Sequence, residues 1–251
     1  MSCTEVLMVG SGSAYSPGRC TSSLIILTPD EYIVLDYGTC TIKALASLGV
    51  SLDEPLHLFT HRHADHTLSA GLALFYQGFK KGPRPFRVIA GQDVLDTLIS
   101  LRKIAVITGS PLPPEIKVEK YPAPGETIGI TPRLKITFLP AKHTVPAHSI
   151  AITYDDATIL VSGDTSPTTV FREHAEKAEL AIHEATLETR YSQYEEFTGH
   201  STVVSAIQQV QPARLGILYH LTGSSAREAE EKTANLTHIL PARDGDSYKV
   251  C

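Results

Sequence analysis

The sequence contains no run of lysine or arginine, and its 22 basic residues are outnumbered by 27 acidic ones. The net charge is −5 when the histidines are counted as neutral. A dedicated nucleic-acid-binding protein carries a basic patch or stripe that attracts the phosphate backbone. Because no such footprint is visible, extended nucleic acid is not the expected partner, although it is left open.

Cysteine is scarce as well. The four cysteines lie far apart, at positions that match neither a disulfide framework nor a zinc finger: Cys3, Cys20, Cys40 and Cys251. A chain of 251 residues does not need covalent cross-links to hold a core together. We therefore expect no disulfide bonds and a reducing compartment, the cytosol.

Long apolar runs are missing too. No uninterrupted apolar run approaches the roughly 18 residues that a membrane-spanning helix needs. The first residues lack a basic region followed by an apolar stretch, which a secretory signal would show. We therefore expect a cytoplasmic protein that makes no membrane contact.

What the sequence does contain is a succession of short apolar, β-branched runs, and 42% of the residues are hydrophobic. These runs predict strands at 5–9, 23–27, 32–35, 56–60, 86–90, 134–139, 150–154, 158–162, 180–182 and 215–219. Apolar residues three and four apart predict helices around 41–48, 66–79, 94–107, 169–178 and 202–210. The proline-rich segment 109–125 is expected to be a long loop. We expect one α/β domain over residues 1–251, in which two sheets pack face to face with helices outside.

The densest chemical signal is the segment His61-Arg62-His63-Ala64-Asp65-His66, which follows a predicted strand and precedes a predicted helix. Imidazole and carboxylate groups are zinc ligands, with bonds of about 2.0 to 2.2 Å. In an extended segment His61 and His63 point the same way and can chelate one ion, while Asp65 and His66 enter the next turn and can reach a second. The segment therefore predicts a metal centre rather than a solvated polar loop.

Three further candidates come at or just after the ends of predicted strands: His143, Asp164 and His220. Polar side chains at strand ends gather at one rim of a sheet. Taken singly, Asp164 could be a helix cap and His220 a hydrogen-bonded core histidine. His148 competes with His143, and we prefer His143.

The order H-x-H-x-D-H, then histidine, then Gly-Asp-Thr, then histidine resembles the metallo-β-lactamase superfamily. The resemblance implies a four-layer αβ/βα sandwich that binds two divalent metal ions, zinc above all, with manganese or iron as alternatives. It places His61, His63 and His143 on one ion, and Asp65, His66 and His220 on the other, with Asp164 bridging both. The implied chemistry is hydrolysis by a hydroxide held between the ions and positioned by Asp65.

Two more segments resemble the ribonuclease Z branch of that superfamily: His183-Glu184-Ala185-Thr186 and His200-Ser201-Thr202. The resemblance implies a dyad in which Glu184 polarises His200 for proton donation to the leaving oxygen, so both are expected to be catalytic. The glycine-rich opening around Val9–Ser23 also resembles that branch, and it makes Arg19 and Ser22 candidates for substrate contact.

The departures from that branch are informative. Its transfer-RNA-processing members carry a long arm between the third histidine and the bridging aspartate, and here little more than a hairpin joins His143 to Asp164. We therefore expect a phosphodiesterase that acts on a small anionic or phosphodiester substrate. The alternatives are a carbonyl-ester hydrolase of the lactonase or thioesterase type, a transfer-RNA 3′-end processing endonuclease, and a metal-binding module without turnover. Dimerisation is common in the resembled branch, so a homodimer stays open.

Overall fold

The structure is a computed structural model that describes residues 3–52, 54–78, 84–106 and 115–251. Two mixed sheets form its centre. Within these ranges each sheet has seven strands. The first has the order β14 (Ser247–Val250), β1 (Thr4–Gly10), β2 (Ser23–Leu27), β3 (Tyr32–Leu35), β4 (Leu56–Leu58), β5 (Phe86–Ile89) and β6 (Ile116–Lys120). The second has the order β13 (Ile239–Pro241), β12 (Leu215–Tyr219), β11 (Leu180–Glu184), β10 (Ala157–Val161), β9 (His148–Tyr154), β8 (Leu134–Pro140) and β7 (Thr127–Gly129).

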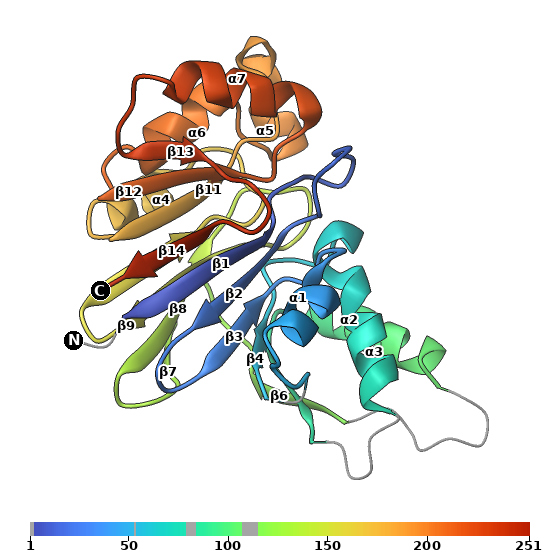
Figure 1. Cartoon of the computed structure of the whole chain (residues 1–251). Helices are drawn as coiled ribbons and strands as arrows, with labels where there is room; N and C mark the ends of the chain where they lie inside the picture. Colours follow the sequence, from blue (N-terminus) through green and yellow to red (C-terminus); the bar gives the residue numbers. More distant parts are fainter. Residues whose placement is uncertain (1–2, 53, 79–83, 107–114) are drawn as a thin grey trace.

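Helices cover the outer face of each sheet (Figure 1). The first sheet carries α1 (Thr41–Ser47), α2 (Ala64–Gln77) and α3 (Gln92–Ile104). The second carries α4 (Thr169–Ala175), α6 (Val203–Val210) and α7 (Gly223–Thr233), with a 3₁₀ turn, η1 (Thr189–Tyr194), and the short α5 (Glu195–Thr198) nearby. The expected layer order of helix, sheet, sheet and helix is therefore confirmed.

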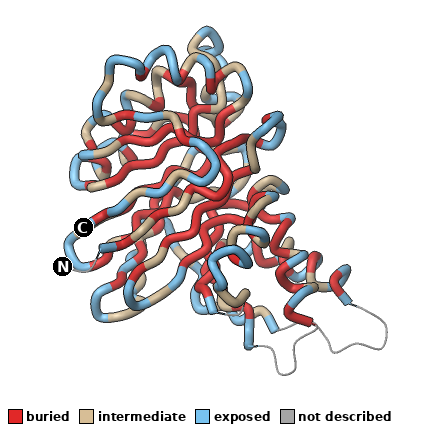
Figure 2. Tube along the Cα trace, viewed as in Figure 1, coloured by how far each residue is buried: buried red, intermediate tan, exposed pale blue. Residues whose placement is uncertain are grey.

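Strands such as β2 and β12 bury both of their faces, which explains why they are continuous apolar runs, whereas β6 at the end of its sheet is largely exposed and alternates. In β2, Leu24 and Ile26 point between the two sheets, whereas Ile25 points into the layer under the helices. The helices pack against these outer faces with apolar residues such as Leu98 of α3 and Val203 of α6. Figure 2 shows the buried backbone running along the strands between these layers, with exposed residues in the outer turns.

Several predicted boundaries were incomplete. The short strands β7, β13 and β14 were missed, as were η1, α5 and α7. The segment 109–125 was expected to be a loop, but its part Ile116–Lys120 is strand β6, paired in parallel with β5; residues 109–114 lie outside the described residues. Only a hairpin, β9 and β10, lies between His143 and Asp164, so the long arm is absent from this interval.

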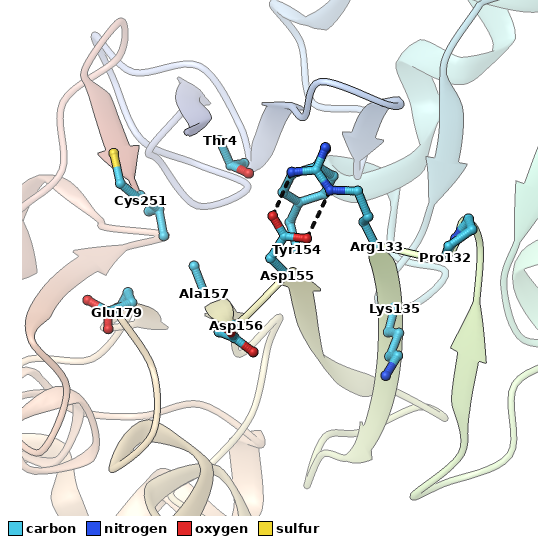
Figure 3. A pocket seen from close by; sticks show the side chains of 11 residues that line it. Thr4, Pro132, Arg133, Lys135, Tyr154, Asp155, Asp156, Ala157, Glu179 and Cys251 are labelled. Atoms are coloured by element: carbon cyan, nitrogen blue, oxygen red, sulfur yellow. Dashed lines mark hydrogen bonds and ion pairs between the residues drawn. The ribbon is translucent and has the colours of Figure 1, made fainter. Parts of the chain in front are cut away.

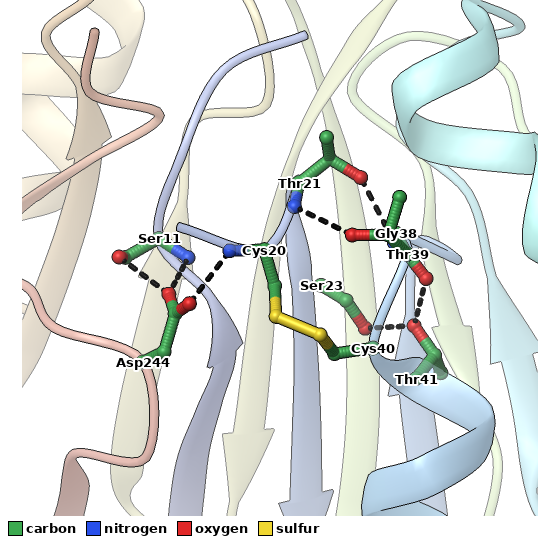
Figure 4. The surroundings of a disulfide bond; sticks show 9 residues. All are labelled: Ser11, Cys20, Thr21, Ser23, Gly38, Thr39, Cys40, Thr41 and Asp244. Carbon is green, nitrogen blue, oxygen red and sulfur yellow. Dashed lines mark hydrogen bonds between the residues drawn. A yellow bond between two sulfur atoms is a disulfide. The ribbon is translucent and has the colours of Figure 1, made fainter. Parts of the chain in front are cut away.

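The expectation that the cysteines are unpaired was wrong, because the structure contains two disulfides, Cys3–Cys251 and Cys20–Cys40. Antiparallel pairing of β1 with β14 sets Thr4 opposite Val250 and brings the Cα atoms of Cys3 and Cys251 to 4.4 Å. The Cys20–Cys40 bond joins the loop after β1 to the N-terminal end of α1 (Figure 4). Distance along the chain does not measure distance in the fold, which is why spacing alone was misleading.

Among the helices in the described ranges, none has the length and apolar character that crossing a membrane would require.

Candidate active site

The carboxyl ends of several neighbouring strands meet at one edge of the sandwich. Strand β3 pairs in parallel with β4, and β10 and β12 both pair in parallel with β11. Parallel strands end at a common edge, so the polar residues that follow each of them come together there. The residues involved are Asp36 after β3, His61 after β4, Asp164 after β10, Glu184 at the end of β11 and His220 after β12.

The first cluster at this edge consists of His61, His63, His143 and Asp164, with one candidate ligand atom from each, all within 4.8 Å of one another. Nε2 of His143 lies 3.0 Å from Nδ1 of His63, and Nε2 of His61 lies 3.6 Å from Oδ2 of Asp164. The predicted histidine His143 is thus brought into the group. His148 is not in it, since its ring packs edge-on against Phe138.

The second cluster consists of Asp65, His66, Asp164 and His220, again with ligand atoms within 4.8 Å. Oδ1 of Asp164 faces this cluster, at 3.3 Å from Nε2 of His66 and 3.4 Å from Nε2 of His220. Oδ2 of the same carboxylate faces the first cluster. Asp164 therefore stands between the two groups with one oxygen toward each.

The donor set fits a pair of divalent cations. Nε2 of His61 and Oδ1 of Asp164 are buried and have no hydrogen-bond partner, which is costly unless something else satisfies them. Burial raises the pKa of Asp164, but His220, His66 and His61 more than offset this and hold it well below its usual range. An ionised, bridging carboxylate among imidazoles is what a dinuclear site needs.

A buried carboxylate that the sequence analysis missed orients two of these histidines. Asp36 accepts hydrogen bonds from Nδ1 of His66 at 2.7 Å and from the backbone N and Oγ1 of Thr60, both at 2.8 Å. The Thr60 hydroxyl in turn lies 3.0 Å from Nδ1 of His61. Such outer partners fix the ring orientation of a metal-binding histidine. Asp36 directly follows strand β3, so the reasoning from strand ends that selected Asp164 could have found it.

The pair Glu184 and His200 lies beside both clusters. Nδ1 of His200 is 2.8 Å from Oε1 of Glu184, which is fully buried, and the His200 ring centroid is 5.0 Å from that of His143 and 5.7 Å from that of His220. Burial lowers the pKa of His200, but the carboxylate of Glu184 more than offsets this and raises it to about 9. Because Nδ1 is engaged, Nε2 is the atom of His200 that can meet a substrate.

Of the two predicted substrate contacts, Arg19 has other partners in the structure and Ser22 is buried. Arg19 donates from Nη1 to Oγ of Ser11 and to the carbonyl of Ala242, both at 2.7 Å. Ser22 is 1% exposed. Their contact with substrate stays a prediction.

A cavity at the opposite edge carries none of this chemistry (Figure 3). It has a volume of about 510 Å³ and lies where β10 and β11 begin, next to Cys251. Arg133 and Asp155 form two hydrogen bonds there, of 2.9 and 2.6 Å. Its lining includes no histidine, in contrast to the edge with the two clusters.

The layers and the two histidine–aspartate clusters define a hydrolase of the metallo-β-lactamase fold with a site suited to two metal ions. The solved structure of the metallo-β-lactamase fold protein YhfI from Bacillus subtilis matches with a TM-score of 0.78, at 19% identity over 98% of this chain and 99% of that one. The model of the anti-Pycsar protein Apyc1 family matches residues 4–232, and the chain belongs to that family.

Two relatives, a ribonuclease Z and an Apyc1 protein, are similar to this chain in sequence. Ribonuclease Z from Mycobacterium marinum is 25% identical over 195 residues, which cover 71% of this chain and 69% of the relative. Anti-Pycsar protein Apyc1 from Bacillus phage vB_BsuM-Goe3 is 32% identical over 98 residues, or 38% of each chain. The chain is therefore related both to ribonuclease Z and to Apyc1.

Proposed function

We propose that this protein is a dinuclear-metal phosphodiesterase that hydrolyses small phosphodiesters, with cyclic nucleotides as the first class to test. The observation that carries the proposal is the Glu184–His200 pair placed beside two metal-binding clusters. Membership in the Apyc1 family supports the substrate class, because Apyc1 is a cyclic nucleotide phosphodiesterase.

Two divalent ions in these clusters would supply an activated water and would stabilise charge on the phosphoryl oxygens. Asp65, whose Oδ2 lies 3.2 Å from Nε2 of His220, would orient that water. His200 would hold a proton on Nε2 and give it to the departing alkoxide. Glu184 stays ionised, since burial raises its pKa but the neighbouring His200 more than offsets this and lowers it, so it can stabilise the charged imidazole.

The proton donor His200, next to the metal clusters, favours phosphodiesters over carbonyl esters as the substrate. An alkoxide that leaves from a phosphodiester is a poor leaving group and benefits from protonation, and a lactone or thioester depends on it less. The short β9–β10 connection and the net charge of −5 count against a long transfer-RNA substrate. We propose zinc as the metal, with manganese or iron as substitutes.

We also keep the cytoplasm as the proposed location, which requires that the chain tolerate reduction of its two disulfides. The homodimer left open by the sequence is a further proposal, and measurement of the molar mass in solution decides it.

The test compares the zinc-loaded protein on four substrates: 3′,5′-cyclic nucleotides, bis-p-nitrophenyl phosphate, a lactone panel and a precursor transfer RNA. We expect hydrolysis of the two small phosphodiesters. His200→Ala should lose about 100-fold or more on cyclic nucleotides, yet keep most activity on bis-p-nitrophenyl phosphate, whose leaving group needs no proton. His174→Ala, a histidine whose Nδ1 bonds to the carbonyl of Val170 within α4, is the matched control.

Hydrolysis of lactones without hydrolysis of any phosphodiester would overturn the proposal in favour of the carbonyl-ester alternative. Preferential cleavage of precursor transfer RNA would favour the endonuclease. Binding of two metal ions without turnover of any substrate would favour a metal-binding module.

A further inference from the structure

The hydroxyl of Thr186 lies between the Glu184–His200 pair and the second metal cluster. Its Oγ1 is 2.7 Å from Oε2 of Glu184 and 2.8 Å from Nδ1 of His220. Thr186 follows β11 by two residues, and His220 directly follows the neighbouring parallel strand β12. The two strand ends thus bring the hydroxyl of one into contact with the imidazole of the other.

The hydrogen bonds in this chain have one consistent direction. Glu184 is ionised and can only accept, so the single proton of the Thr186 hydroxyl is donated to Oε2. The carbonyl of His220 is a weaker competitor for that proton at 3.2 Å, because it is neutral and more distant. Oγ1 therefore accepts at its other side, and Nδ1 of His220 must carry the proton that it accepts.

An imidazole protonated on Nδ1 presents the lone pair of Nε2. Nε2 of His220 is the atom that faces the second cluster, at 3.2 Å from Oδ2 of Asp65 and 3.3 Å from Nε2 of His66. The direction of the hydrogen bonds and the position of the metal-facing atom therefore agree.

We infer that Thr186 is a positioning residue, whose hydroxyl holds His220 in the tautomer that binds the second metal ion and ties that ligand to the same carboxylate that orients His200. The inference rests on the proposed function, because it assumes that the second cluster binds metal. It goes further in assigning one carboxylate to both parts of the site. Oε1 of Glu184 accepts from His200 and from the backbone N of Thr165, and Oε2 accepts from the backbone N and Oγ1 of Thr186.

The other half of the molecule contains the same arrangement around the first cluster. The Thr60 hydroxyl donates to Asp36 at 2.8 Å and lies 3.0 Å from Nδ1 of His61. A carboxylate, a threonine and a histidine thus occur in the same order on both sides. Thr60 contacts His61 of the first cluster and, through Asp36, is linked to His66 of the second, but it makes no contact with His220, so it is a control for the His220 tautomer.

The experiment uses Thr186→Val, which keeps the volume and removes the hydroxyl, and Thr186→Ser, which restores the hydroxyl. Thr186→Ala is a second variant without the hydroxyl, and it serves if the valine does not fit. Competition with a chromophoric chelator measures the affinity for each of the two zinc ions, and imidazole ¹⁵N spectra of the zinc-loaded protein report which nitrogen of His220 is protonated.

We expect Thr186→Val to lower the affinity for one zinc ion by about 10- to 100-fold and to leave the affinity for the other unchanged. The Nδ1–H signal of His220 should be lost or shifted, and Thr186→Ser should be close to wild type in both readouts. Thr60→Val should also weaken zinc binding, because it loosens His61 and the Asp36 carboxylate that holds His66, yet it should leave the His220 signal in place.

The inference is overturned if both variants without the hydroxyl bind two zinc ions with wild-type affinity and keep the Nδ1–H signal of His220. That outcome would leave the proposed function standing. A wild-type protein that binds no pair of ions would instead overturn the proposed function itself.

Discussion

Replacement of Glu184 by glutamine removes a charge and preserves the size of the side chain. The carboxylate is fully buried and accepts from four donors, including Nδ1 of His200 at 2.8 Å. Glutamine has only one acceptor oxygen, and its amide group would face donors. We expect the main effect to be on the charge state of His200, because the carboxylate raises the pKa of that imidazole.

The magnitude follows from the two pKa values. Glu184 raises the pKa of His200 from 6.5 to about 9, against the opposing effect of burial. At pH 8 about nine tenths of the His200 rings carry the proton in the wild type. The variant loses the carboxylate but keeps the burial that lowers the pKa, so at most about 3% of its rings, the fraction at a pKa of 6.5, would carry the proton. Glu184→Gln should therefore reduce the rate at least about 30-fold at pH 8, with a smaller loss at lower pH.

The assay is the pH profile of kcat on a cyclic nucleotide, from about pH 5 to 10. His200 must be protonated to act as the acid, so activity falls as the pH rises through its pKa, and the variant should lose activity at lower pH than wild type. Bound cations lower both pKa values, so the informative quantity is the displacement between the two profiles. Glu188→Gln, which makes the same chemical change at a residue that pairs with Arg190, is the control. A uniform drop with no displacement would refute the assignment of Glu184.

Two further predictions address the support around the site and the stability of the fold. Asp36→Asn removes the charged acceptor of His66, and asparagine tolerates the φ of 60° at this position. We expect metal binding to weaken about 10- to 100-fold in chelator competition. The control Asp156→Asn, at an exposed position, should bind metal as the wild type does. Equal affinities would show that the carboxylate does not support the ligands. Reduction of the Cys3–Cys251 bond, which joins residues 248 apart, should lower the free energy of unfolding by up to about 5 kcal/mol in urea titrations, and a change under about 1 kcal/mol would contradict this.

The sequence was sufficient for those strands whose two faces are both buried, because they are unbroken β-branched runs such as the one that contains Ile25. It was insufficient for strands such as β13 and β14, which have three and four residues. Such short segments carry little periodicity, and their pairing with distant strands defines them. The Cys3–Cys251 bond was missed for the same reason, since it depends on the pairing of β1 with β14.

The candidate site was more predictable at its centre than at its periphery. Metal-binding residues are a restricted set of types, so the H-x-H-x-D-H segment is visible without a structure. Asp36 and Thr186 are common residue types at strand ends, and only the hydrogen bonds to His66 and His220 reveal what they do. The resemblance to known families was sufficient to identify the candidate ligands, whereas the structure was needed to identify the side chains that orient them.

Asp164 and the histidines around it have a consequence for assembly of the molecule. Each cluster draws residues from both halves: the first takes His61 and His63 from one half and His143 and Asp164 from the other, and the second is divided in the same way. Neither half alone can offer a complete set of ligands. Metal binding would therefore hold the two sheets together. Folding of this chain in the cell would then depend on the supply of metal.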